Sequence, residues 1–267
     1  MVREEKEVIK KNLKYKKIEI VRIRNNQKEE ISDIVVRESN FAIFLNGKKL
    51  VTLKGTPENY DYLGIGFLYT SGILQKKEDI SSVVVDEKQK SVRIKAKNIY
   101  SPLEDSLRDS LIPRRANIEE KLISKLLPVK CFLKVKSEII FTLMNAMQEK
   151  AKLFKLTGGV HSCALADKQG SIILFTEDIS RYNTIDKILG EAFLKDILRE
   201  DAIILTSCRI TSDILIKIAF GKIPIIASRA APTDKAVELA KKIGITLVGF
   251  VREKGMNIYS YPERIEF

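Results

Sequence analysis

Residues 202–212 read AIILTSCRITS, and residues 224–233 read PIIASRAAPT. Each segment begins with a short apolar run and then changes to small polar residues and one arginine. A short run of branched aliphatic residues is typical of a strand that is buried on both faces. The Ser and Thr residues that follow are typical of helix starts, because their side chains accept hydrogen bonds from free backbone N–H groups. Each segment therefore predicts a buried strand followed directly by a helix.

The same alternation extends in both directions along the chain. Two further apolar runs, at residues 172–175 and 246–251, predict two more strands. The segments between the four strands have helical periodicity, at residues 184–198, 212–220 and 233–243. Alternating helices and buried strands favour parallel pairing, with helices on both faces of the sheet. We therefore predict an α/β domain with a mostly parallel sheet at residues 137–267.

The first part of the chain has a different pattern. Two strand pairs are predicted, residues 41–45 with 49–53 and residues 82–85 with 92–95. Asn46-Gly47 separates the first pair and favours a tight hairpin turn. Thr56 predicts the N-cap of a helix. We expect a small α+β domain at residues 1–120, whose last part, residues 99–120, is a long basic loop without periodicity.

The net charge of +12 restricts the classes of partner. It has two explanations, a lysine-coated surface or attraction of an anion such as phosphate. The basic residues are scattered and are not interleaved with aromatic residues, so we expect no nucleic acid partner. No apolar run approaches the roughly 18 residues needed to cross a bilayer, so we expect no membrane partner. We read no signal peptide in the charged first residues and expect a cytoplasmic protein.

An arginine follows each of the four predicted strands. These residues are Arg181, Arg209, Arg229 and Arg252. Ligands of open α/β sheets bind beyond the carboxyl ends of the strands, where Ser207 and Ser228 are also expected. Arginine matches phosphate geometry, and helix starts offer oriented N–H groups. The sequence predicts a site for a phosphorylated ligand at this edge. The alternative is that the serines are ordinary caps and the arginines pair with Asp178, Asp186 or Asp213.

The glycine pair at residues 157–162, TGGVHS, precedes the single histidine of the chain, His161. Paired glycines allow positive φ and a close approach of the backbone to a ligand. His161 would then act as a hydrogen-bond donor or as an acid or base. The alternative is a turn next to a capping residue, and the residues alone leave both open.

The chain has three cysteines, Cys131, Cys163 and Cys208. An odd number of cysteines without a C-x-x-C pair predicts neither a disulfide framework nor a zinc site, and we expect no metal ligands in the protein. Cys163 and Cys208 are expected as small buried hydrophobic residues, with a thiolate at Cys208 as the alternative. Cys131 lies between two lysines, so both burial and reactivity remain open.

Several segments together resemble one family. These segments are LNG (45–47), LGIGFL (63–68), TGGVHSCAL (157–165), EDISRYNTIDK (177–187), SCRITSD (207–213), SRAAPT (228–233) and GFVR (249–252). They occur in the family's order and cover most of the chain. The sequence is therefore similar to the formate dehydrogenase accessory sulfurtransferase family, FdhD.

The resemblance implies a fold and a function. It implies a small N-terminal domain, a cytidine-deaminase-like α/β/α domain and a homodimer. It also implies a sulfurtransferase or sulfur carrier that a cysteine desulfurase loads with persulfide sulfur. The sulfur then passes to the molybdenum or tungsten of a bis-molybdopterin guanine dinucleotide cofactor, which is delivered to formate dehydrogenase. GDP or GTP would mimic part of this cofactor.

The resemblance also suggests cofactor-binding residues. The closing block corresponds to cofactor binding in the family and comprises Phe250, Val251, Arg252, Glu253, Lys254 and Gly255. The strand ends and the glycine–histidine segment add His161, Arg181, Ser207, Arg209, Ser228 and Arg229.

The chain departs from the family pattern at two places. Residues 111–117 lack the family's cysteine pair, and Tyr182 replaces its histidine. Cys131 is therefore our candidate for the persulfide carrier, because a thiolate must accept the sulfur. The alternative is a cofactor-binding chaperone that has lost sulfur transfer. A zinc deaminase is a third class, but the glutamate and the Pro-Cys-x-x-Cys segment that it needs are missing.

Overall fold

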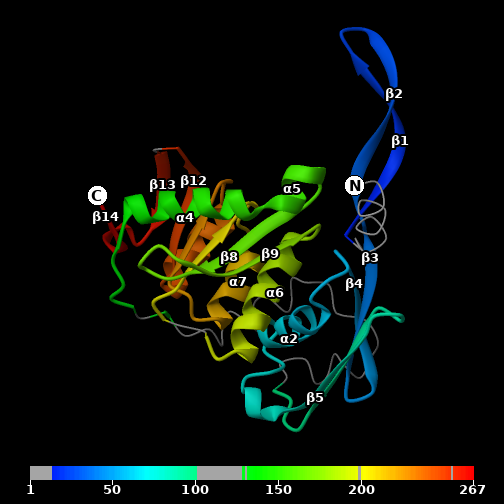
Figure 1. The fold of residues 1–267 in the computed structure, drawn as a ribbon. Coiled ribbons are helices and arrows are strands. Elements are labelled where there is room, and N and C mark those ends of the chain that lie inside the picture. Colours follow the sequence, from blue (N-terminus) through cyan, green and yellow to red (C-terminus); the bar gives the residue numbers. More distant parts are fainter. Residues whose placement is uncertain (1–13, 101–127, 130, 198–199, 254) are drawn as a thin grey trace.

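A computed structural model describes residues 14–100, 128–129, 131–197, 200–253 and 255–267. A six-stranded sheet and a four-stranded sheet lie on either side of a group of helices (Figure 1). The strands are β1 (Tyr15–Arg24), β2 (Gln27–Val36), β3 (Ser39–Leu45), β4 (Lys48–Gly55), β5 (Ile80–Asp86), β6 (Ser91–Ala96), β7 (Val135–Lys136), β8 (His161–Ala166), β9 (Ile172–Asp178), β10 (Ile203–Thr206), β11 (Ile225–Ser228), β12 (Thr246–Arg252), β13 (Gly255–Ser260) and β14 (Ile265–Glu266). The helices are α2 (Tyr60–Thr70), α4 (Ser137–Lys150), α5 (Lys152–Thr157), α6 (Arg181–Leu194), α7 (Ser212–Phe220) and α8 (Asp234–Ile243), with the 3-10 turns η1 (Lys77–Asp79) and η2 (Pro262–Arg264).

The six-stranded sheet has the order β13-β12-β11-β10-β8-β9. Strands β10, β11 and β12 are parallel neighbours, and β8 is antiparallel to both β10 and β9. The four predicted strands therefore run in one direction, and the α/β fold class is confirmed. β8 and β13 run the opposite way, because each forms a hairpin with a neighbouring strand. We did not predict β8, since its sequence HSCALA is small and has no β-branched residue.

Helices cover both faces of this sheet. Alternate side chains of a strand point to opposite faces. Accordingly, Ile203 and Leu205 of β10 pack in the cluster that contains α4, whereas Ile204 packs in the cluster that contains α6, α7 and α8. Because both faces are covered, the strands are apolar at almost every position. This explains the continuous apolar runs in the sequence.

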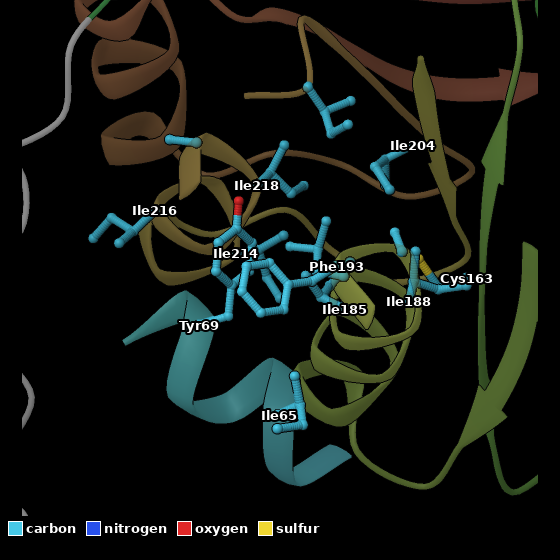
Figure 2. Packing of buried hydrophobic residues seen from close by; sticks show 14 of the residues in the cluster. Ile65, Tyr69, Cys163, Ile185, Ile188, Phe193, Ile204, Ile214, Ile216 and Ile218 are labelled. Atoms are coloured by element: carbon cyan, nitrogen blue, oxygen red, sulfur yellow. The ribbon is translucent and has the colours of Figure 1, made fainter. Parts of the chain in front are cut away.

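Helix α2 of the N-terminal part packs directly on α6. The two backbones touch at their glycines: a Cβ added to Gly190 would lie 2.0 Å from the carbonyl oxygen of Tyr62. A Cβ added to Gly66 would lie 1.8 Å from the carbonyl oxygen of Asp186. Beside this crossing, the rings of Tyr69 and Phe193 stack with centroids 4.5 Å apart. In Figure 2, Ile65 and Tyr69 of α2 point towards the residues of α6 and α7.

One hydrophobic cluster continues from the four-stranded sheet through α2 to the six-stranded sheet. It includes Phe41 of β3 and Leu247 of β12. The division into domains at residues 1–120 and 137–267 stays a prediction, and the described parts of both share this cluster. Most of the predicted basic loop, residues 101–120, lies outside the described residues.

The four-stranded sheet has the order β4-β3-β6-β5, and the predicted hairpin at Asn46-Gly47 is confirmed. Both turn residues have positive φ, 48° at Asn46 and 84° at Gly47. The predicted helix start at Thr56 is wrong. Helix α2 begins at Tyr60, and the hydroxyl of Thr56 donates instead to Asp178 of β9, at 2.9 Å.

A two-stranded ribbon, β1 and β2, precedes these elements and extends away from the rest of the molecule (Figure 1). We did not predict it. Its turn consists of Asn25 and Asn26, both at positive φ, which asparagine tolerates well. Val21 and Ile23 on the ribbon are apolar but exposed, so the alternation of apolar and polar residues that predicts a strand is weak here.

Candidate functional site

The carboxyl ends of β9, β10, β11 and β12 meet at one edge of the sheet. His161 at the start of β8 lies opposite Asp178, the last residue of β9. Thr206, which ends β10, lies opposite Ser228, which ends β11. We call this edge the carboxyl edge, and it gathers His161, Arg181, Ser207, Arg209, Ser228 and Arg229. The expected meeting of the strand ends is therefore observed. That these residues bind a ligand stays a prediction.

Both predicted serines hold the loops of this edge together. The Ser207 hydroxyl accepts a hydrogen bond from the Ser162 backbone N–H, at 2.9 Å. The buried Ser228 hydroxyl donates to the Cys208 carbonyl at 2.7 Å and accepts from the Ala230 N–H at 3.0 Å. Their hydroxyls already have partners in the protein, so the two serines fix the loops of the edge.

The four arginines of the strand ends differ in their surroundings. Arg181 lies against the ring of Tyr182, donates to its hydroxyl at 2.9 Å, and is half-buried. Arg229 is hydrogen-bonded to the side chain of Gln148 on α4. Arg209 and Arg252 are exposed. The edge therefore combines two arginines that are held by neighbours with two whose side chains face solvent.

The alternative that these arginines pair with Asp178 or Asp186 is wrong. Lysines occupy both carboxylates: Lys187 lies 2.7 Å from Asp178, and Lys217 lies 2.8 Å from Asp186. The hydroxyl of Tyr182 lies 3.2 Å from Asp213, so the third carboxylate is linked to Arg181 through Tyr182.

Asp178 and Lys187 form a buried ion pair directly behind the edge. Their side chains are 0% and 1% exposed. The carboxylate also accepts hydrogen bonds from Thr56, Ser180 and Asn183, at distances between 2.8 and 3.1 Å. We did not single out Lys187 or Gln148, and we expected Thr56 only as a helix cap. An isolated lysine or glutamine in an amphipathic helix is usually a solvated residue, and nothing in the sequence distinguishes these.

His161 is half-buried, between a positive and a negative group. Burial lowers its pKa from the usual 6.5, and the charge of Arg181 lowers it further, while Asp178 acts in the opposite direction. The imidazole is therefore neutral at pH 7, with one nitrogen able to donate and the other able to accept a hydrogen bond.

This shift gives a prediction about pH. In the unfolded chain His161 binds a proton near pH 6.5, whereas in the folded protein it does so only at lower pH. The unfolded state then binds more protons, so His161 should make the folded protein less stable as pH falls through 6.5 and below. An NMR titration of the imidazole should give a midpoint below 6.5. A midpoint at or above that value would contradict the stated environment.

The closing block lies beside the same edge at the end of β12. The Phe250 N–H donates to the Ala230 carbonyl at 3.2 Å, and the Phe250 ring is 41% exposed at a φ of +53°. A bulky residue at positive φ is strained. Val251 is buried in the core, so its side chain does not face a ligand. The exposed residues of the block are Phe250, Arg252, Glu253 and Gly255, and Lys254 lies outside the described residues.

Cys163 and Cys208 are both buried, as expected. Burial raises the pKa of both thiols. Arg181 lowers the pKa of Cys208, but burial dominates. This disfavours the alternative of a thiolate at Cys208, because the ionised form of a buried thiol is poorly solvated.

Cys131 lies at the opposite edge of the sheet. Its thiol donates to the carbonyl of Glu200, at 3.1 Å, and Glu200 comes before β10 begins. The N–H of nearby Val129 donates to the carbonyl of Ile243, which ends α8 just before β12. A strand of four residues spans about 13 Å, so about the length of β10 separates the contact of Cys131 with Glu200 from the carboxyl edge. The candidate carrier and the candidate cofactor residues are thus not brought together within one chain.

These features define a class of protein: an α/β protein with arginines, a neutral histidine and helix N-termini gathered where the strands end. Such an edge suits a phosphorylated ligand. Among the residues that the structure describes, no group of three His, Cys, Asp or Glu side chains could hold a metal ion, and no helix is long and apolar enough to span a membrane.

Comparison with known proteins identifies the particular family. Residues 36–266 match the model of the FdhD/NarQ family, and the chain belongs to this family. It is 31% identical to the sulfur carrier protein FdhD of Shouchella clausii, over 93% of this chain and 96% of the relative. It is 33% identical to the protein of the same name from Wolinella succinogenes, over 94% of this chain and 89% of the relative. The crystal structure of a candidate formate dehydrogenase accessory protein from Desulfotalea psychrophila matches with a TM-score of 0.82 and 27% identity, covering 96% of this chain and 100% of that chain.

Proposed function

We propose that the protein is a sulfur carrier that serves the maturation of formate dehydrogenase and binds bis-molybdopterin guanine dinucleotide at the carboxyl edge. The relatives named sulfur carrier protein FdhD support this role, because they align with this chain over nearly its whole length. In this proposal a cysteine desulfurase supplies the sulfur, and the molybdenum or tungsten of the cofactor receives it. A homodimer in the cytoplasm completes the proposal.

The proposed binding of the cofactor is supported by one observation, the gathering of arginines at the strand ends. Arg209 and Arg252 are exposed, and Arg229 is anchored by Gln148, so three guanidinium groups are available to anionic oxygens. A dinucleotide cofactor carries several phosphates, which arginine binds through paired hydrogen bonds. The N-termini of α6, α7 and α8 follow the same strands and add favourable dipole ends.

A second candidate function follows from the position of Cys131. A chaperone that binds the cofactor without carrying sulfur needs no thiol at the carboxyl edge. All three cysteines are among the described residues, two are buried, and Cys131 lies at the other edge. This observation favours the chaperone over transfer within a single chain.

Guanine nucleotides test the binding half. We expect GDP and GTP to bind the purified protein in isothermal titration calorimetry, and Arg229→Ala or Arg252→Ala to weaken binding. A hydrogen bond to a charged group contributes about 1.5 to 3 kcal/mol, which corresponds to roughly 10- to 150-fold in the dissociation constant. Arg93→Ala is a matched control, because Arg93 lies on the four-stranded sheet over the ring of Phe44.

The outcome is decided by comparison of these variants. If GDP and GTP do not bind, or if Arg93→Ala weakens binding as much as Arg252→Ala does, then the carboxyl edge is not the nucleotide site. ADP measured in parallel distinguishes recognition of the guanine base from simple attraction of phosphate.

A further inference from the structure

The ion pair of Asp178 and Lys187 joins two consecutive elements, β9 and α6, to a distant part of the chain. Lys187 belongs to α6, Asp178 ends β9, and Thr56 comes from the N-terminal part. The Lys187 ammonium donates to Asp178 at 2.7 Å and to the Thr56 hydroxyl at 3.0 Å. Thr56 in turn donates to the same carboxylate oxygen through its N–H and its hydroxyl, at 3.1 and 2.9 Å.

The other carboxylate oxygen of Asp178 holds the turn that leads into α6. It accepts the backbone N–H of Ser180 at 2.8 Å and the side-chain amide of Asn183 at 3.1 Å. The Ser180 hydroxyl caps α6 by accepting from the N–H of Asn183. Arg181 is the next residue, so the Asp178 carboxylate determines where the backbone of Arg181 lies. His161 lies opposite Asp178 in the neighbouring strand.

We propose that Lys187 is a positioning residue, which through the Asp178 carboxylate and Thr56 fixes the β9–α6 turn and thereby the places of Arg181 and His161 at the carboxyl edge. Neither Lys187 nor Thr56 reaches the edge itself, since both side chains are fully buried. Buried ion pairs are weak sources of stability, because the desolvation of both charges offsets their attraction. A role in positioning accounts for a fully buried pair better than a role in stability does.

The chain contains a matched pair that serves as a control. Asp186, the residue before Lys187, accepts hydrogen bonds from Lys217 of α7 at 2.8 Å and from Thr70 of α2 at 2.7 Å. This second pair also joins α6 to the N-terminal part through a threonine. Its hydrogen bonds link α6 to α2 and α7 and not to the β9–α6 turn, so it shares the structural role of the first pair without the positioning role.

His161 allows a direct test, because it is the only histidine of the chain and gives a single imidazole signal in NMR. In Lys187→Met the Asp178 carboxylate loses its counter-charge but keeps its hydrogen bonds from Thr56, Ser180 and Asn183. An unbalanced negative charge opposite His161, and an Arg181 that is less well fixed, both raise the pKa of the imidazole. We therefore expect the midpoint of the His161 titration to rise.

A second experiment titrates Lys187→Met and its control variants with GDP. Only this experiment rests on the proposed function. We expect Lys187→Met to weaken GDP binding about tenfold, which is the effect of misplacing one arginine contact. Lys217→Met should lower the melting temperature but leave both the His161 titration and the GDP affinity as in the unaltered protein. Thr56→Val keeps both charges and removes only the hydroxyl, and it should move both readouts in the same direction by a smaller amount.

Each result of these titrations either supports or overturns the proposed role of Lys187. The proposal is overturned if Lys187→Met and Thr56→Val titrate like the unaltered protein, or if Lys217→Met shifts His161 as much as they do. If Lys187→Met does not fold, then Thr56→Val gives the answer. If the unaltered protein binds no GDP, the proposed function fails, and the His161 titration still tests the role of Lys187.

Discussion

Gly190→Ala is expected to abolish stable folding, although alanine is the better residue for a helix. The added methyl carbon would lie 2.0 Å from the carbonyl oxygen of Tyr62 and 2.6 Å from the backbone nitrogen of Gly66. Both contacts are with backbone atoms, which cannot rotate away as a side chain can. Overpacking typically costs about 1 to 3 kcal/mol, and we expect a methyl group forced against backbone atoms to cost more. Whole domains are stable by only about 5 to 15 kcal/mol.

The direction of the change in stability distinguishes the effect of the helix crossing from the effect of helix propensity. In an open helix, alanine stabilises by about 0.8 to 1.0 kcal/mol relative to glycine. Thermal unfolding followed by circular dichroism should instead show a large fall in Tm, or no cooperative transition. Gly255→Ala is the control, because a methyl group there meets its nearest atom only at 3.8 Å. A Gly190→Ala protein as stable as the unaltered one would show that α2 and α6 do not cross in this way.

Sulfur uptake is expected to depend entirely on Cys131. After incubation with a cysteine desulfurase and L-cysteine, the unaltered protein should gain the mass of one sulfur atom, and Cys131→Ser should gain none. In the proposed step the Cys131 thiolate attacks the outer sulfur of the desulfurase persulfide, and the desulfurase thiolate leaves. Cys163 and Cys208 are buried, and burial raises the pKa of both thiols, so neither offers an accessible nucleophile.

Intact mass spectrometry followed by peptide mapping reads the result, and Cys208→Ala should retain the label. An unlabelled parent protein would exclude the sulfur-carrier role and leave the cofactor-binding chaperone. A label on Cys131→Ser would assign the role to one of the buried cysteines. Because Cys131 and the carboxyl edge lie at opposite ends of the strands, sulfur on Cys131 would be remote from a cofactor bound at that edge of the same chain.

The parts of the fold with strong periodicity could be predicted from the sequence. The buried strands β10 and β11, each followed by a polar helix start, identified the α/β class and the edge where their ends meet. The hairpin at Asn46-Gly47 was equally clear, because few other residue pairs adopt its backbone conformation. Of the candidate site, the sequence predicted arginines at the strand ends, and Arg252 lies at the end of β12 and Arg209 just after β10.

The rest depended on contacts between residues that are far apart in the chain. Thr56 resembles a helix cap in the sequence, but its hydroxyl donates a hydrogen bond to Asp178, 122 residues later. Lys187 looks like a surface lysine, because its partner becomes apparent only when α6 packs on β9. Cys131 was chosen because a thiolate must accept the sulfur and Cys131 is the cysteine nearest to the segment that lacks the family's cysteine pair, and two lysines lie close to it in the sequence. The charge of neighbouring residues does not show which edge of a sheet a segment reaches. Cys131 and the arginines differ in this respect, because they lie at opposite edges.

The glycine crossing of α2 and α6 also has a consequence for biosynthesis. Helix α2 ends at Thr70 and α6 ends at Leu194, so the first leaves the ribosome long before its partner. At about 5 to 20 residues per second, the delay is roughly 6 to 25 seconds. During this time the four-stranded sheet and α2 expose the apolar surface that α6 later covers. The nascent chain must therefore be protected from aggregation until its second half arrives, and synthesis rate and chaperone supply will influence the yield of this protein.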